Sequence, residues 1–168
     1  LTSEIIASVA KIMSNLDLIY GAKKIQVTAH CNTTIGLPGT LSFRLQPNHT
    51  TDDLDGIMIS LMEGLSYGVG DAVIGLNPVI DTVDSVANVL KLFEDFKQKW
   101  QIPTQNCVLA HVTTQMAAIR KGAPADMIFQ SIAGTEKGNL AFGLNAKLLE
   151  EAQELVLKEG TSMGPNVM

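Results

Sequence analysis

Three polar side chains, Arg44, Gln46 and Asn77, stand where two predicted strands end. Residues 40–46 alternate between apolar and polar types, so Arg44 and Gln46 share the face opposite the apolar side chains. Asn77 ends a second apolar strand, directly before Pro78. A guanidinium fork beside two carboxamides can both donate to and accept from a small polar ligand. The three residues are therefore candidates for a substrate-binding site.

Each candidate also has a structural interpretation. A buried guanidinium without a partner is costly, so the alternative for Arg44 and Gln46 is a structural ion pair or a solvated strand end. For Asn77 the alternative is a simple turn, because Asn-Pro pairs commonly begin turns. Gly75 shares the predicted face of Asn77 and leaves room there for a bulky neighbour. Because the two strands are neighbours that end at one level, the joint pattern favours a ligand site.

Other chemistry-bearing residues are scattered. Gln130 interrupts a predicted strand at residues 127–131 and is a further candidate for ligand contact. His111 lies in the apolar run 107–112, and we interpret it as a core histidine bonded to a carbonyl. Without a second histidine or a carboxylate at fixed spacing, no metal site is supported. No nucleophile elbow or triad occurs either, so the sequence identifies no catalytic residue within the chain.

The elements that position these residues follow a regular order. Apolar spacing predicts a helix over residues 2–18, ended by Gly21, and then four strand–helix units. The four predicted strands are 40–46, 71–77, 107–112 and 127–131. The helices begin at Asp52 or Asp53, at Asp81 or Asp84, at Thr113 or Thr114 and near Asn145. Residues 166–168 indicate the start of a fifth strand, and with Leu1 as first residue they suggest a piece of a longer protein.

Alternating strands and helices predict an α/β fold with a parallel sheet. A doubly wound sheet and a barrel both fit this order. Gly68-x-Gly70 precedes its strand, which argues against a dinucleotide-binding loop, and polar residues collect at strand ends as in barrel enzymes. We therefore predict the N-terminal half of a (β/α)8 TIM barrel, a single partial domain over residues 1–168. Residues 1–39 form its leading helix and connecting segment, and residues 40–168 form the βα units.

Composition narrows the class of protein. The net charge is −5 and the longest basic runs are pairs, so binding to nucleic acid through phosphates is not expected. Charged residues make up 17%, against about 25% in an average soluble domain, so other chains or the rest of a fold are expected to cover the surface. No apolar run approaches the roughly 18 residues of a membrane span. Two cysteines without a C-x-x-C motif favour a reduced, cytoplasmic protein.

Several stretches closely resemble the large subunit of the adenosylcobalamin-dependent ethanolamine ammonia-lyases. They are residues 18–24, 32–40, 44–48, 68–75, 77–79, 102–105, 108–115 and 128–131. The resemblance implies a (β/α)8 barrel that binds ethanolamine at its mouth, beneath adenosylcobalamin held largely by a separate small subunit. It implies an oligomer of large subunits, and radical conversion of ethanolamine to acetaldehyde and ammonia. The implied location is the cytoplasm, including the interior of a bacterial microcompartment.

The resemblance also implies roles for single residues. Carried over by the Arg-Leu-Gln-Pro and Asn-Pro-Val motifs, Arg44, Gln46 and Asn77 are substrate ligands. Pro78, and Gln130 in a Phe-Gln-Ser motif, match positions that contact the cobalamin. Arg44 and Asn77 can donate to the substrate hydroxyl while Gln46 accepts from its ammonium group.

The family's two substrate-binding carboxylates, a Glu in a Phe-Glu-Thr-Gly-Gln motif and a later Asp, would follow the last residue of this sequence. We therefore expect the fragment alone to be inactive. An inactive half-barrel that serves as a binding or assembly module is the alternative reading. A barrel aldolase or other metal-free lyase ranks last, because no predicted strand ends in a Schiff-base lysine.

Overall fold

The computed structural model describes residues 1–162, which form two compact units. One unit contains residues 1–27 and 131–150, and the other contains residues 28–130 and, within the described range, 151–162. The helices are α1 (Ser3–Ile12), α2 (Asn15–Lys23), α3 (Leu54–Ser66), α4 (Val83–Trp100), α5 (Val112–Arg120), α6 (Glu136–Ala141) and α7 (Ala146–Glu159). The strands are β1 (Ala29–His30), β2 (Thr34–Ile35), β3 (Arg44–Leu45), β4 (Val73–Leu76) and β5 (Asn106–Val108).

The predicted helix over residues 2–18 is in fact two helices. Thr2 caps α1 as expected, but Met13 is extended and Ser14 begins α2. The Ser14 hydroxyl accepts from the Asp17 N–H at 3.2 Å, and the Asp17 carboxylate accepts from the Ser14 N–H at 3.0 Å. The Ser14 hydroxyl also donates to the Asp17 carboxylate at 2.6 Å, and this bond, together with that from the Ser14 N–H, holds the pKa of Asp17 below its usual value. The capping box thus overrides an apolar spacing that runs through the break, and α2 continues past Gly21.

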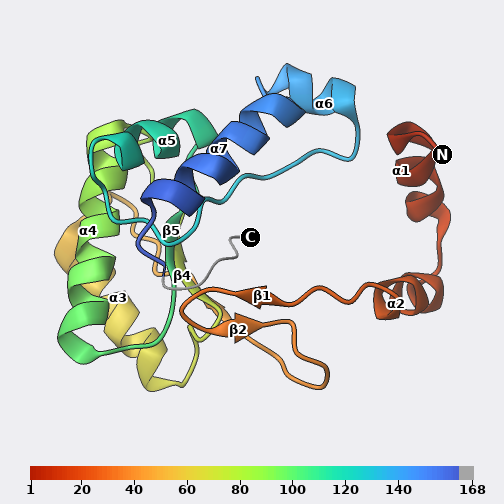
Figure 1. Cartoon of the computed structure of the whole chain (residues 1–168). Helices are drawn as coiled ribbons and strands as arrows, with labels where there is room; N and C mark the ends of the chain where they lie inside the picture. Colours follow the sequence, from red (N-terminus) through yellow and green to blue (C-terminus); the bar gives the residue numbers. More distant parts are fainter. Residues whose placement is uncertain (163–168) are drawn as a thin grey trace. The chain divides into compact units, whose positions relative to one another are not determined.

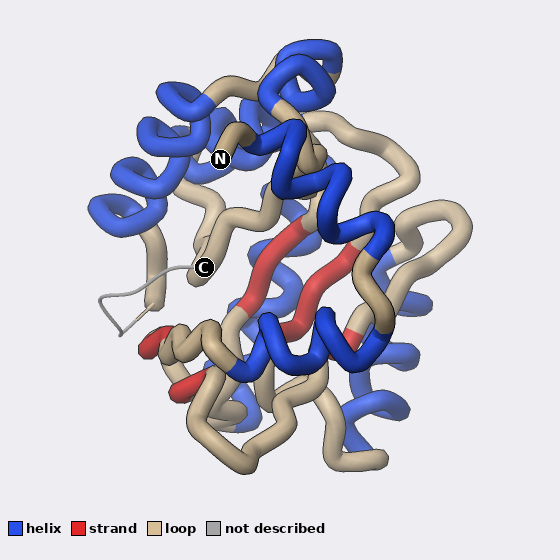
Figure 2. Tube along the Cα trace, turned by 90° about the vertical axis from the view of Figure 1, so that its right-hand side faces the viewer, coloured by secondary structure: helices blue, strands red, loops and turns tan. Residues whose placement is uncertain are grey.

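The larger unit is built on a parallel sheet whose strands lie in chain order, β3-β4-β5 (Figure 2). Arg44 pairs with Val73, and Ile74 pairs with Asn106. Residues 127–131 form no regular strand, but the Met127 N–H donates to the Asn106 carbonyl at 3.2 Å. The parallel pairing of β3, β4 and β5 confirms the predicted α/β class with a parallel sheet. No closed barrel forms among residues 1–162.

Helix α3 packs against β3 and α4 against β5, and α4 contacts both α3 and α5 (Figure 1). Asp53 caps α3 as predicted, whereas Thr82, not Asp81 or Asp84, caps α4. The apolar stripe of α4 is buried as its spacing predicts, through Val86, Val89, Leu90, Phe93 and Phe96. Burying these side chains holds the helices on one face and leaves the opposite face of the strands for the polar candidates.

Two predicted strands are shorter than their patterns suggest. β3 covers only Arg44–Leu45 of the predicted residues 40–46, and Leu41, one of the apolar side chains of that pattern, is 85% exposed. β5 ends at Val108, and residue 112 already begins α5. An antiparallel pair, β1 and β2, lies in the segment predicted only to connect. Short apolar runs do not distinguish a strand end from a buried helix start.

Some predictions meet no test in this structure. The fifth strand expected at residues 166–168 lies outside the described residues. The single partial barrel domain over residues 1–168 stays a prediction. Through residue 162, no helix is long and apolar enough to cross a membrane.

Candidate functional site

Arg44 and Gln46 meet at the carboxyl end of β3. The Arg44 Nη2 donates to the Gln46 Oε1 at 2.6 Å, and the guanidinium carbon lies 5.4 Å from the centroid of the Phe129 ring. Arg44 is exposed and Gln46 is half-buried, so both can reach a ligand without unfolding the sheet. A cation over an aromatic face is stabilised by the ring quadrupole and is held in place. Phe129, which the sequence did not single out, therefore helps to orient the candidate ligand Arg44.

Gly75 gives Arg44 its path across the neighbouring strand. A Cβ on Gly75 would lie 2.9 Å from the Cys107 Sγ and 3.6 Å from the Arg44 Cδ. The missing side chain thus lets Arg44 and Cys107 approach each other over β4. Val73 and Met127 are buried on this same face with Cys107, and Phe129 packs against them. Because these apolar side chains occupy this face of the strands, the polar groups lie at the carboxyl ends of the strands.

Cys107 is the ionisable group among these buried apolar residues. Its burial raises the pKa of the thiol to about 12; the positive charge of Arg44 opposes the shift and the carboxylate of Asp126 adds to it. The thiolate is the reactive form, so Cys107 is inert at neutral pH and is no candidate nucleophile.

A thiol-labelling experiment checks this environment. At pH 8 we expect iodoacetamide to modify the half-buried Cys31 at least tenfold faster than Cys107, since thiolate fraction and access control the rate. Because the folded pKa of Cys107 is raised, the thiol favours the folded state below the pKa of the unfolded chain. That contribution falls as pH rises from about 9 toward 12. Equal labelling of both cysteines in the folded protein would contradict the burial of Cys107.

Asn77 is held by the loop that follows the preceding strand. It is exposed directly after β4, and its N–H donates to the Asn48 Oδ1 at 2.9 Å. Asp52 accepts from the Val79 N–H and the Ile80 N–H, each at 2.8 Å. The backbone around Asn77 is therefore fixed by side chains of the β3–α3 loop, and neither of these side chains was predicted to act there.

Gln130 and His111 face the start of α5. The Gln130 Oε1 accepts from the Val112 N–H at 2.8 Å. The carboxamide thus satisfies an N–H of the first turn of α5, which has no partner within the helix. His111 is not a core residue of a strand; it is half-buried and caps α5, its Nδ1 accepting from the Thr113 N–H at 3.3 Å. Asp81, which lies after β4 and was predicted as a possible helix start, accepts from the His111 N–H at 3.0 Å.

The structure thus brings some of the predicted site residues together and leaves others apart. Arg44 and Gln46 are in direct contact, and Asn77 stands at the end of the adjacent strand β4. Pro78 follows it and is half-buried. The Gln130 carboxamide contacts the first turn of α5. Within residues 1–162 no group of three or more His, Cys, Asp or Glu is placed to hold a metal ion.

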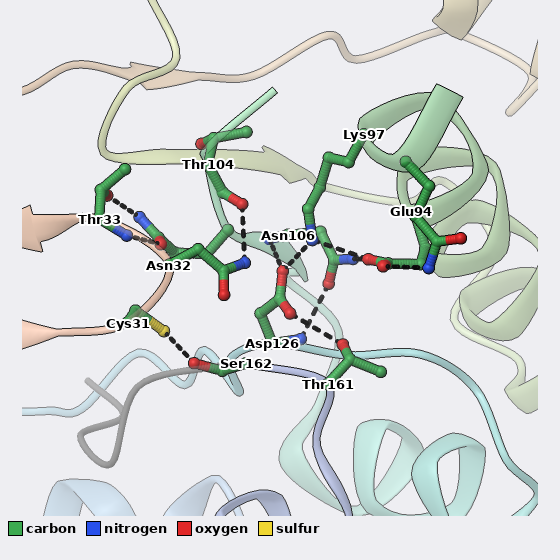
Figure 3. Close-up of polar contacts among 12 residues, drawn as sticks. Cys31, Asn32, Thr33, Glu94, Lys97, Thr104, Asn106, Asp126, Thr161 and Ser162 are labelled. Carbon is green, nitrogen blue, oxygen red and sulfur yellow. Dashed lines mark hydrogen bonds and ion pairs between the residues drawn. The ribbon is translucent and has the colours of Figure 1, made fainter. Parts of the chain in front are cut away.

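A second polar cluster lies at the amino ends of the strands and is drawn in Figure 3. Lys97 of α4 is almost fully buried, forms an ion pair with Asp126 and donates to the Glu94 Oε2 at 2.7 Å. Asp126 also accepts from the Asn106 N–H at 2.9 Å and from the Thr161 hydroxyl at 2.8 Å. A cavity of about 430 Å³ opens beside Glu94 and Lys97. Its charged groups are paired with one another, and the cluster lies at the opposite ends of the strands from Arg44 and Asn77, so we treat it as structural.

A parallel α/β protein with a donor fork and two carboxamides at its strand ends has the features of a small-molecule site on a scaffold of βα units. Comparison with known proteins makes this specific. The family model of the ethanolamine ammonia lyase large subunit matches residues 1–168. The chain belongs to the ethanolamine ammonia-lyase large subunit family, as the motifs implied.

Curated relatives agree with the family model. Ethanolamine ammonia-lyase large subunit of Escherichia coli (strain K12) is 55% identical over 168 residues, which are 100% of this chain and 37% of the relative. The protein of the same name from Salmonella typhimurium (strain LT2) is 54% identical over the same shares. The chain therefore spans 37% of the length of the curated relatives it matches.

Proposed function

We propose that this chain is part of the catalytic large subunit of an ethanolamine ammonia-lyase, which converts ethanolamine to acetaldehyde and ammonia with adenosylcobalamin. The observation that carries the proposal is the family match, which extends over all 168 residues. The positions of Arg44, Gln46 and Asn77 at the carboxyl ends of two adjacent parallel strands support it.

The arrangement of elements supports half of a (β/α)8 barrel. Crossovers between parallel strands are almost always right-handed, so strands in chain order place their helices on one face, as in a barrel. β3, β4 and β5 are in that order, and α4 packs between α3 and α5. Beyond β5, the Met127 N–H donates to the Asn106 carbonyl and the Thr161 N–H donates to the Ala125 carbonyl. Two further segments thus continue the series of neighbours, whereas a doubly wound sheet would reverse it.

The polar groups suit ethanolamine as follows. Arg44 and the Asn77 carboxamide donate to the substrate hydroxyl, and the Gln46 Oε1, which now accepts from Arg44, turns to accept from the ammonium group. The clamp carries one positive charge and no anion, so it does not favour a cation by itself. Carboxylates elsewhere in the complete subunit must supply that attraction.

The residues that follow these strand ends would suit contact with adenosylcobalamin. After β4 the half-buried Pro78 is followed by Val79 and Ile80, which are 62% and 54% exposed, and Asp52 fixes their backbone. A short apolar edge of this kind suits a broad macrocycle, with Pro78 and Gln130 as the residues that would contact it. Adenosylcobalamin, when bound, supplies the carbon radical that takes hydrogen from the substrate. The chain's own residues orient the substrate and exclude water. A small subunit and further large subunits are the proposed partners.

The test is turnover by the complete large subunit with its small subunit. We expect acetaldehyde release that requires added adenosylcobalamin. Asn77→Ala should raise KM for ethanolamine about tenfold, the effect of one lost hydrogen bond to a substrate hydroxyl. The matched control is Asn145→Ala, which removes an exposed cap of α7 whose Oδ1 accepts from the Leu148 N–H at 2.8 Å. Its KM should be unchanged.

Two outcomes would contradict this proposal. Absence of ethanolamine turnover in the complete, cofactor-loaded complex would favour the alternative of a half-barrel that serves binding or assembly. An unchanged KM in Asn77→Ala, with the control equally unchanged, would remove Asn77 from the site.

A further inference from the structure

Side chains of the β3–α3 loop reach across to the loop after β4. The Asn48 Oδ1 accepts from the Asn77 N–H at 2.9 Å, and the Asp52 carboxylate accepts from the Val79 N–H and the Ile80 N–H at 2.8 Å. These three N–H groups follow the last residue of β4, where Pro78 has no N–H to offer. All backbone donors of residues 77–80 are therefore bound by two side chains of one neighbouring loop.

The loop that supplies these acceptors is itself rigid. Asp52 is in the left-handed conformation with φ 53°, which points its carboxylate away from its own loop. The His49 Nδ1 accepts from the Thr51 N–H at 3.4 Å and from the Asp53 N–H at 3.3 Å. A Cβ on Gly56 would lie 2.6 Å from the His49 ring, so the ring is packed against the first turns of α3. Asp53 then begins α3 as its cap.

We propose that Asn48 and Asp52 are positioning residues that set the Asn77 carboxamide at the level of Arg44 and Gln46. The inference rests on the proposed role of Asn77 as a substrate ligand. Asn48 is four residues beyond Arg44 in the chain, so one short segment carries a substrate ligand and the acceptor that places the next one. Binding geometry is sensitive to displacements of about 1 Å, which is the scale of motion that a freed loop N–H permits.

The alternative is a purely structural loop contact, and the two differ in how mutations combine. If Asn48 acts through Asn77, its removal matters only while the Asn77 side chain is present. The Asn77 N–H survives in Asn77→Ala, so a general loss of loop stability would be equal in both backgrounds. A double-mutant cycle therefore separates positioning from stability.

The experiment uses the complete large subunit with its small subunit and adenosylcobalamin, and measures KM and kcat for ethanolamine. Asn48→Ala and Asp52→Ala, which each remove the acceptor oxygens, are expected to raise KM about tenfold, with kcat changed less. Asn48→Asp keeps an acceptor oxygen and should restore KM to within about twofold of the parent. In the Asn77→Ala background, Asn48→Ala should change KM by less than about twofold.

The matched control is Asp53→Ala, which sits next to Asp52 but caps α3 by accepting from the Gly56 N–H at 2.8 Å. It should lower the thermal midpoint and leave KM unchanged. The positioning role alone would be overturned if Asn48→Ala raised KM by the same factor in the parent and in the Asn77→Ala background. It would also be overturned if Asn48→Ala left KM unchanged while Asn77→Ala raised it. If Asn77→Ala itself has no effect, the proposed substrate role of Asn77 fails first and this inference falls with it.

Discussion

Arg44→Ala in the complete subunit is expected to lower kcat/KM for ethanolamine by about 10- to 100-fold, the range for one charge-assisted hydrogen bond. The guanidinium is held over Phe129 and against the Gln46 Oε1 at 2.6 Å, so it is oriented before substrate arrives. Arg44 is exposed, and its partner Gln46 is only half-buried, so water can replace the donor that the substitution removes. The effect should therefore appear in steady-state kinetics with circular dichroism unchanged.

Two variants distinguish the role of the paired N–H donors of the Arg44 guanidinium from that of its positive charge alone. Arg44→Lys keeps the cation but loses the planar pair of donors, so we expect it to recover only part of the lost activity. Arg120→Ala, which removes an exposed cation in the last turn of α5, should keep the parental kcat/KM. Parental kinetics in Arg44→Ala would show that the Arg44–Gln46 contact is structural, the alternative that the sequence left open.

The sequence predicted the strand-end residues well because period-two alternation constrains them directly. Arg44 and Gln46 share a face through residues 44–46, and Gly75 was recognised as a gap that only a bulky neighbour explains. Motif resemblance then named the family, which the comparison confirmed over the whole chain. The roles carried over by motif to Arg44, Gln46, Asn77, Pro78 and Gln130 stay predictions, since contact geometry alone does not reveal a ligand.

What the sequence did not predict depends on side chain–backbone bonds, two of them local and others between distant residues. The break at Met13 follows from a Ser14–Asp17 capping box that competes with continuous apolar spacing. His111 looked like a core residue because its neighbours are apolar, yet it caps α5. Asn48 and Asp52 looked like ordinary turn residues, since nothing local marks the loop of residues 77–80 as their partner.

Lys97 and Asp126 are the clearest case of such a missed interaction, and they carry the largest expected effect on stability. Asp126→Ala leaves the Lys97 ammonium with Glu94 alone and removes the acceptor of the Asn106 N–H and the Thr161 hydroxyl. Breaking a buried pair from one side costs about 3–5 kcal/mol. We therefore expect hydrogen exchange in the peptide that covers residues 104–108 to accelerate about 100-fold or more.

A matched control lies on the same helix. Lys91 and Asp95 of α4 form an ion pair at 2.8 Å with side chains 68% and 63% exposed, and losing such a pair costs about 0.3–0.5 kcal/mol. Asp95→Ala should therefore leave exchange of residues 104–108 nearly unchanged. Similar hydrogen exchange of residues 104–108 in Asp126→Ala and Asp95→Ala would mean that the Asp126 carboxylate does not hold β5 and Thr161 together. Because Asp126 lies at the amino ends of the strands, it should stabilise the sheet without entering the substrate site. Substrate KM in Asp126→Ala should then stay near the parental value wherever the variant remains folded.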